Sequence, residues 1–310
     1  VFRGNQPSRI GSNAQMELLY DAFDWPTAKA VRDAFQMRDW NEVERPALAW
    51  LGEAIEIRPH TAATFRRRAR ANLLLVGDEE ETIFGMLSST FLSLAAFYRP
   101  NELQLRIADL SLSDVEWSDA CELFAQHFDF HDVVVTERRG GGKLLEAAAQ
   151  VVSQRVAAYQ AGHDDLGPSL YFVVAGAHKV PELRPASGRF GDELSEGGKK
   201  LVEIAKNGPE VGVHVIAWYD SVKSFEAGLG RPALNLFDRR VALPMSGDDS
   251  QFLLREATAG KLPRYRALLY DDEQGQALQK FKPYALPQSV GERAALFSHY
   301  AERLRQRLGR

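Results

Sequence analysis

An α/β fold built on a doubly wound, mostly parallel sheet is predicted by three features of the sequence. Short apolar runs such as Leu73–Val76 and Leu170–Val174 contain no polar residue at alternate positions. Segments with the apolar spacing of helices separate these runs, and the alternation recurs about five times. Uninterrupted strands are typical of parallel sheets buried on both faces, and the intervening helices supply the crossover connections that parallel strands require.

The N-terminal part precedes this alternation. Residues 1 to about 45 have helical apolar spacing that is broken at Trp25-Pro26, which predicts two short helices. A short hairpin should follow, with Leu48–Leu51 in its first strand and a turn at Gly52-Glu53.

From Asn72 onward, strands and helices are predicted in turn. The strands are expected at Leu73–Val76, Leu105–Ala108, Val133–Val135, Leu170–Val174, Val213–Trp218, Arg240–Leu243 and Ala267–Tyr270. The helices are expected at Ile83–Phe97, Val115–Phe128, from Lys143 to about Tyr159, Gly198–Lys206 and Val290–Arg310. The last of these is amphipathic, with Leu296, Tyr300 and Leu304 on one stripe. We therefore expect an N-terminal helical extension (1–47), a main domain (48–287) and a C-terminal amphipathic helix (288–310).

Composition narrows the class of protein. The chain has 310 residues, is 45% hydrophobic and has a net charge of -4, so no overall field draws it to nucleic acid or to an anionic membrane. One cysteine, Cys121, excludes a disulfide framework, and no apolar run approaches the ~20 residues that span a bilayer. The start at Val1 without a signal-peptide pattern indicates a piece of a longer protein. We expect a cytoplasmic location, although the parent protein could be membrane-associated.

The turn after Val76 is the first place to look for a ligand site, because ligands bind at the carboxyl ends of strands in open α/β sheets. A phosphate loop has the pattern G-x-x-x-x-G-K-S/T. Gly77 matches the first glycine, but Thr82, Ile83 and Phe84 replace the second glycine, the lysine and the hydroxyl residue. Asp78–Glu81 adds four carboxylates where a polyphosphate would lie. The pattern predicts that this loop does not bind ATP in the usual way.

The segment nevertheless resembles the FtsK/SpoIIIE branch of the RecA-like motor ATPases, and later segments share that resemblance. The family pattern A-x-x-G-R-A-x-G-I-H is similar to Ala205–His214, with Gly208, Gly212 and His214 at the family spacing. The patterns S-x-x-D-S-R and G-x-x-L are similar to Ser246–Gln251 and to the segment that begins at Gly260. The resemblance covers about residues 48 to 287 and implies a RecA-like P-loop fold.

The departures from the family pattern fall on catalytic positions. The family's Walker B strand ends in Asp-Glu, whereas Tyr171–Val174 runs into Ala175-Gly176-Ala177. Pro209 and Gln251 stand at the two arginine positions, and Tyr219-Asp220 replaces the polar sensor pair Thr-Gln. With the lysine and hydroxyl also missing, the groups that stabilise phosphoryl transfer are gone.

The resemblance therefore implies a catalytically degenerate domain that serves as a scaffold, regulatory or oligomerisation module of a larger translocase-like protein, similar to EccC/EssC-type motors. No catalytic residue and no metal site is expected, and ATP and Mg²⁺ would bind only if the degenerate site is used. Other ATPase domains of the same parent chain are the expected partners, with a homo-oligomer and a DNA or peptide substrate as further possibilities.

Two alternatives stay open. The chain could be an active ATP-driven translocase of DNA or protein with a site completed by a neighbouring subunit. It could also be a nucleic-acid-binding module, because phosphates could contact Arg66, Arg67, Arg68, Arg70 and Lys143. The competing interpretation is a solvated edge or a contact with an adjoining domain for the four arginines, and a flexible basic loop for Lys143.

Three other features have competing interpretations. Asp78–Glu81 could bind a divalent metal or a partner, but acidic residues at a helix start more commonly complement the helix dipole. His214 lies in an apolar strand and is expected to be packed and hydrogen-bonded rather than a ligand. Asp220, at a strand end, is expected to be a loop or capping residue.

Overall fold

The computed structural model describes residues 8–9, 46–55, 61–110, 117–137, 140–184, 193–273, 275 and 277–307. The two helices predicted before residue 45 lie outside these residues. The strands are β1 (Ser8–Arg9), β2 (Ala47–Ala54), β3 (Thr61–Phe65), β4 (Leu73–Val76), β5 (Leu103–Asp109), β6 (Asp132–Thr136), β7 (Ser169–Ala175), β8 (Val213–Tyr219), β9 (Arg239–Ala242), β10 (Ala267–Asp271) and β11 (Ala277–Ala285). The helices are α3 (Glu80–Phe97), α4 (Ala120–His127), α5 (Gly141–Gln160), α6 (Glu196–Asn207), α7 (Val222–Leu229), α8 (Gly247–Leu254) and α9 (Val290–Arg307).

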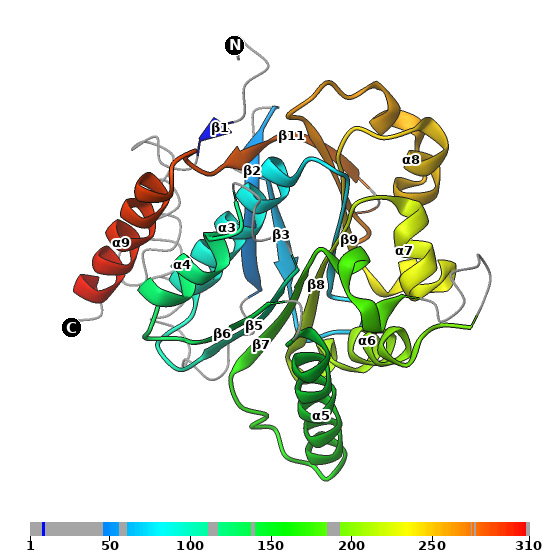
Figure 1. Cartoon of the computed structure of the whole chain (residues 1–310). Coiled ribbons are helices and arrows are strands. Elements are labelled where there is room, and N and C mark those ends of the chain that lie inside the picture. Colours follow the sequence, from blue (N-terminus) through cyan, green and yellow to red (C-terminus); the bar gives the residue numbers. More distant parts are fainter. Residues whose placement is uncertain are drawn as a thin grey trace.

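A single mixed sheet runs through the molecule in the order β3-β2-β11-β10-β9-β4-β8-β7-β5-β6 (Figure 1). The half from β9 to β6 is parallel throughout, which confirms the predicted mostly parallel, doubly wound arrangement. Alternate residues of β4 enter two different cores. Leu73 and Leu75 pack on the side of α3, α4 and α9, whereas Leu74 and Val76 pack on the side of α5 to α8. Helices on both faces explain why this strand is apolar at every position.

The other half of the sheet, from β9 to β3, is antiparallel, and of its strands β3 and β11 were not predicted. The predicted turn at Gly52-Glu53 is wrong, because β2 continues through these residues and pairs with β3. A Cβ on Gly52 would lie 2.2 Å from the carbonyl oxygen of Lys282 on β11. This glycine therefore permits close approach of two strands and does not form a turn.

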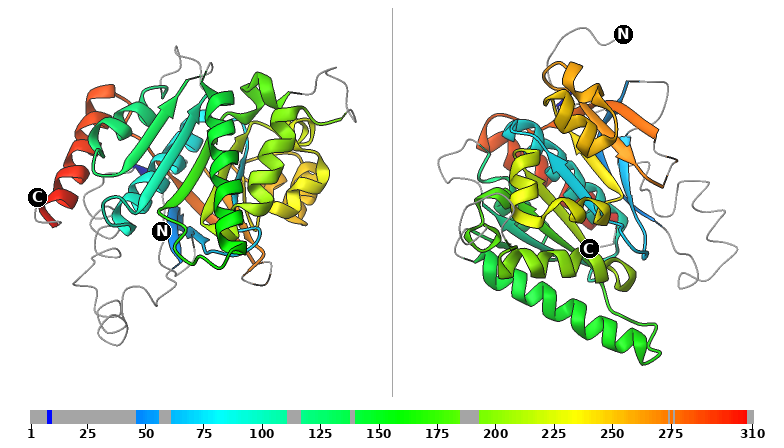
Figure 2. Two further views of the ribbon diagram at one scale, coloured as in Figure 1. Left: turned by 90° about the horizontal axis from the view of Figure 1, so that it is seen from below. Right: turned by 90° about the vertical axis from the view of Figure 1, so that its right-hand side faces the viewer.

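Helix α3 lies inside the fold rather than on it (Figures 1 and 2). Every residue from Thr82 to Ala95 is buried. The parallel strands cover one side, and β2 and β11 cover another, where the backbone N–H of Trp50 donates to Ser93 Oγ at 3.1 Å. A Cβ on Gly85 would lie 2.1 Å from the carbonyl oxygen of Tyr284. A helix that is apolar around most of its circumference is expected when it is enclosed in this way.

Helix α9 docks on α4 through the predicted apolar stripe. Tyr300 and Leu304 are buried, and the Phe297 and Phe124 rings meet edge to face with centroids 5.8 Å apart. The buried Arg293 forms an ion pair of 2.9 Å with Asp119. No helix among the described residues is both long enough and apolar enough to cross a bilayer.

Candidate functional site

The turn after β4 is shorter than the loop of the phosphate-binding pattern. Only Gly77, Asp78 and Glu79 separate the end of β4 from the start of α3 at Glu80. The helix thus begins three residues before the predicted Ile83. Thr82, Ile83 and Phe84, which occupy phosphate-loop positions in the sequence pattern, lie in the first turns of α3 and are at most 1% exposed. A phosphate cradle is built from the residues between the two glycine positions, and here α3 already begins among them, at Glu80.

Gly77 is fixed against the two strands that flank β4. Its N–H donates to the carbonyl oxygen of Tyr219 at 3.0 Å, and its own carbonyl oxygen accepts the indole N–H of Trp218 at 2.8 Å. Its φ of +148° and the position of Leu243, 2.5 Å from where a Cβ would lie, both require glycine. The turn is therefore closed by contacts from β8 and from the residue that follows β9.

Trp218 fills the space above the turn. Its side chain is 1% exposed and contacts the ring of Phe84 at 6.0 Å and that of His178 at 5.3 Å, both edge to face. The ammonium of Lys179 lies 5.6 Å from the indole centroid. Trp218 from β8 thus contacts His178 and Lys179 from the segment after β7 at the carboxyl edge of the parallel sheet.

Two carboxylates at the start of α3 are bound by other side chains of the chain. Lys179 Nζ lies 2.7 Å from Glu80 Oε1, and these side chains are 15% and 28% exposed. The Tyr265 hydroxyl donates to Glu81 Oε2 at 3.3 Å. Glu80 and Glu81 occupy the first turn of α3, where they complement the helix dipole. Among the residues that the structure describes, no group of three or more His, Cys, Asp and Glu side chains could hold a metal ion.

The segment after β7, where a Walker B acid would be expected, contains His178 instead. The backbone N–H of Asp220 donates to His178 Nδ1 at 3.2 Å, and burial lowers the pKa of this imidazole. The Asp220 carboxylate accepts the hydroxyls of Ser221 and Ser224 at the start of α7. Asp220 is thus part of a helix cap, as the sequence predicted, and the neutral His178 is a hydrogen-bond acceptor beside it.

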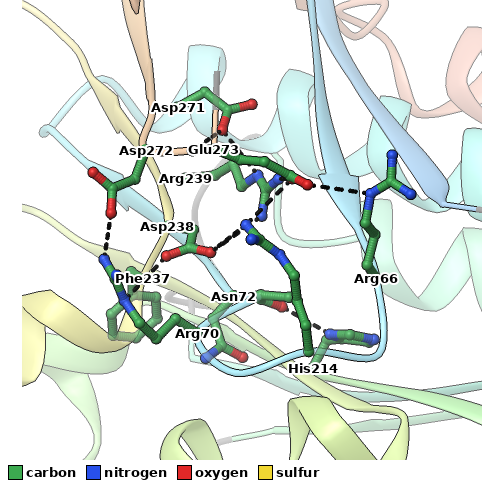
Figure 3. Close-up of polar contacts among 12 residues, drawn as sticks. Arg66, Arg70, Asn72, His214, Phe237, Asp238, Arg239, Asp271, Asp272 and Glu273 are labelled. Atoms are coloured by element: carbon green, nitrogen blue, oxygen red, sulfur yellow. Dashed lines mark hydrogen bonds and ion pairs between the residues drawn. The ribbon is translucent and has the colours of Figure 1, made fainter. Parts of the chain in front are cut away.

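The predicted arginine cluster lies at the opposite edge of the sheet, because its residues precede β4. Figure 3 shows that it forms an ion-pair network with carboxylates that lie just before β9 and just after β10. Arg68 binds Asp238 at 2.6 Å, and Arg70 binds Asp272 at 2.6 Å. The more exposed Arg66 lies 3.3 Å from Glu273.

A residue that the sequence analysis missed lies at the centre of this network. The Arg239 side chain is completely buried and contacts Glu273 through Nη2 and Asp271 through Nε, the latter at 3.5 Å. Burial raises the pKa of the adjacent Asp238 carboxyl, and the neighbouring arginines oppose that shift. The sequence did contain a signal for this network. Two arginines, Arg239-Arg240, stand at the start of one predicted strand, and three acidic residues, Asp271–Glu273, stand at the end of another.

The remaining predicted contacts are placed separately. Arg67 is exposed and donates to the carbonyl oxygen of Gly167 at 3.4 Å. Lys143 is exposed in the first turn of α5, which follows β6, so it lies at the carboxyl edge of the sheet. The structure therefore does not bring Lys143 together with the four arginines. Arg138 and Arg139, next to it in sequence, lie outside the described residues.

His214 is packed as predicted. It is 3% exposed, its Nδ1 lies 2.7 Å from the carbonyl oxygen of Ala71, and its ring stacks on Tyr171 with centroids 5.2 Å apart. Burial lowers the pKa of this histidine to about 4. It is therefore a neutral core residue that links β8 to the segment before β4.

Comparison with known proteins identifies the fold. No protein-family model matches the chain, and no curated protein does. Among solved structures, the cytoplasmic domain of the type VII secretion ATPase EccC of Thermomonospora curvata matches with a TM-score of 0.59 and 15% identity, over 85% of this chain and 32% of that one. EssC (ATPases 2 and 3) of Geobacillus thermodenitrificans matches with a TM-score of 0.58 and 15% identity, over 85% of this chain and 49% of that one.

A third match is the monomer form of TcpA, the pCW3 conjugation coupling protein, solved with ATPγS. The TM-score is 0.54 and the identity 12%, over 80% of this chain and 69% of that one. Identities this low establish shared architecture, so these matches confirm a RecA-like α/β fold that resembles FtsK/SpoIIIE-type motors. The chain spans about a third of the EccC structure and half of the EssC structure.

Proposed function

We propose that this chain is a catalytically degenerate FtsK/SpoIIIE-type ATPase domain that acts as a scaffold, regulatory or oligomerisation module of a larger translocase-like protein. The observation that carries the proposal is the filled carboxyl edge of β4 and β8. There, Trp218 is hydrogen-bonded to Gly77, and Lys179 is paired with Glu80.

Nucleotide binding would have to disrupt both contacts. A polyphosphate at the start of α3 would displace the Glu80 carboxylate from Lys179 and would meet the charges of Asp78, Glu79 and Glu81. The chain offers no compensating groups there, since Ile83 and Phe84 replace the lysine and hydroxyl of a phosphate loop. Without a lysine and a hydroxyl at these positions, both the binding of a nucleotide and the transfer of its phosphoryl group are disfavoured.

The partners of such a module are other ATPase domains of the same parent chain. One of the structural matches is described as EssC ATPases 2 and 3, and this chain covers 49% of it. A domain without its own nucleotide would offer a packing surface to neighbours that hydrolyse ATP and would hold them in a fixed arrangement.

The type VII secretion ATPase EccC is described as having a cytoplasmic domain, which supports a cytoplasmic location for this chain.

Calorimetric titration of the 310-residue chain with MgATP and MgADP tests the proposal. We expect no binding at micromolar concentrations. Lys179→Met and Lys143→Met are matched variants, since Lys179 faces the filled edge and Lys143 is exposed on α5. Micromolar binding by the wild-type chain that is lost in Lys179→Met, and retained in Lys143→Met, would overturn the proposal.

An active ATP-driven translocase is the second candidate, and the observation that favours it is the match to secretion and conjugation motors. This candidate requires a neighbouring subunit to complete the site. It predicts that hydrolysis of ATP by the chain increases steeply with protein concentration. Hydrolysis that stays at the buffer rate at every concentration would exclude it.

A further inference from the structure

We propose that the free edge of β6 is a self-association surface, at which a second copy of this chain adds its own β6 in antiparallel orientation. Among the residues that the structure describes, β6 (Asp132–Thr136) is the last strand of the parallel half and pairs only with β5. Figure 1 shows it outside β5 at that end of the sheet. An edge strand presents unpaired backbone N–H and C=O groups that another strand can bind.

The two ends of the sheet differ in the burial of their side chains. At the β3 end, Thr61, Ala63 and Phe65 are buried, and the Phe65 ring contacts Tyr171 on β7 with centroids 5.0 Å apart. In β6, by contrast, no residue is buried. Its register with β5 is regular, and the strand contains no proline, lysine or bulge of the kind that usually blocks edge pairing.

The sequence of β6 favours a second copy over an unrelated strand because it is nearly palindromic. In an antiparallel pair centred on Val134, Val133 faces Val135 and Asp132 faces Thr136, so three valine positions form the centre. No like charges face each other in this register. A two-fold axis through Val134 places the same surface on both partners, as an isologous dimer requires.

Side-chain exposure and charge fit this register. The Val134 side chain is one of the few large apolar groups left exposed, at 38%. Asp132 is neutralised within the chain by Arg106, whose Nη2 lies 2.6 Å from Asp132 Oδ2. The strand therefore has an apolar centre, and its one charged side chain, Asp132, is paired within the chain. Unpaired charged side chains are what normally prevents edge strands from associating.

Cysteine cross-linking tests this pairing directly. Two residues facing each other across an antiparallel pair have Cα atoms about 4.5 to 5.5 Å apart, within the range for a disulfide. The native Cys121 is 1% exposed and should not compete. We expect Val134→Cys to form a covalent dimer under mild oxidation. Val290→Cys, at a residue that is 56% exposed on α9, is the matched control and should remain monomeric.

Sedimentation velocity of the 310-residue chain provides a second readout. The wild-type chain and Val134→Thr, which keeps a β-branched residue, should both dimerise. Val134→Glu places two carboxylates at the two-fold axis and should weaken the dimer about tenfold or more. Three results would each overturn the proposal: a wild-type chain that is monomeric at all attainable concentrations, a dimer unaffected by Val134→Glu, or equal cross-linking of the two cysteine variants.

Discussion

The indole N–H of Trp218 donates to the backbone carbonyl oxygen of Gly77 over 2.8 Å, and both groups are buried. This bond joins the end of β8 to the turn after β4, the two strand ends between which a ligand would bind in an open α/β sheet. It is a contact within the chain at this edge of the sheet. The turn is consequently part of the core and contributes to folding stability.

Replacing Trp218 should therefore destabilise the whole fold. Trp218→Phe keeps the aromatic contacts with Phe84 and His178 but leaves the Gly77 oxygen without its donor, so we expect a loss of about 1 to 3 kcal/mol in the free energy of unfolding. Trp218→Ala also leaves a cavity and should cost about 3 to 5 kcal/mol. Urea unfolding followed by circular dichroism measures both. A Trp218→Phe variant as stable as the wild type would show that the bond is not important.

The Lys179–Glu80 ion pair should contribute to stability because it is largely shielded from water. Lys179→Met should lower the free energy of unfolding by about 1 to 2 kcal/mol, between the values for exposed and buried pairs. A double-mutant cycle with Glu80→Gln isolates the interaction. Lys199→Met, which breaks the exposed contact between Lys199 and Glu196, is the control and should have no measurable effect. Additive effects of Lys179→Met and Glu80→Gln would contradict the coupling.

Arg239 should be the most sensitive residue of the ion-pair network. Arg239→Met leaves the buried carboxylates of Asp238 and Asp271 without their central cation, so we expect a loss of about 3 to 5 kcal/mol. Arg66→Ala removes a half-exposed partner of the same network and should cost less than about 1 kcal/mol. Thermal or urea unfolding separates the two variants. Equal losses would mean that burial does not determine the contribution of each arginine.

Stability should fall between pH 6.5 and 4 because two buried histidines resist protonation. Burial lowers the pKa of both His131 and His214 from 6.5 to about 4. In this window the unfolded chain binds protons at these residues and the folded chain does not. Each histidine therefore changes the free energy of unfolding by up to about 1.4 kcal/mol per pH unit. Above pH 6.5 both imidazoles are neutral in either state, and their contribution is fully present.

Unfolding in urea at a series of pH values measures this slope. The double variant His131→Gln and His214→Gln should reduce it, whereas His163→Gln, at an exposed position, should leave it unchanged. An identical pH profile for the wild type and the double variant would refute the assignment.

The parallel half of the sheet could be predicted because its strands are buried on both faces. That burial selects continuous apolar runs such as those in β4 and β7, which stand out in a sequence. The antiparallel half was harder to predict. β11 contains Lys280, Lys282 and Pro283, and β3 is rich in Ala and Thr, so neither has an apolar run. These strands are defined by pairing with distant segments.

The sequence by itself determined the fold class and showed that Thr82, Ile83 and Phe84 stand where a phosphate loop has glycine, lysine and a hydroxyl residue, because both depend on residue type at fixed spacing along the chain. Only the tertiary structure decided what lies at the carboxyl edge of β4 and β8. Trp218 and Lys179 lie far from Gly77 and Glu80 in sequence and meet them through the crossover order of the sheet. The tertiary structure likewise paired the arginines before β4 with carboxylates just before β9 and just after β10, because contacts between distant segments are set by packing rather than by local pattern.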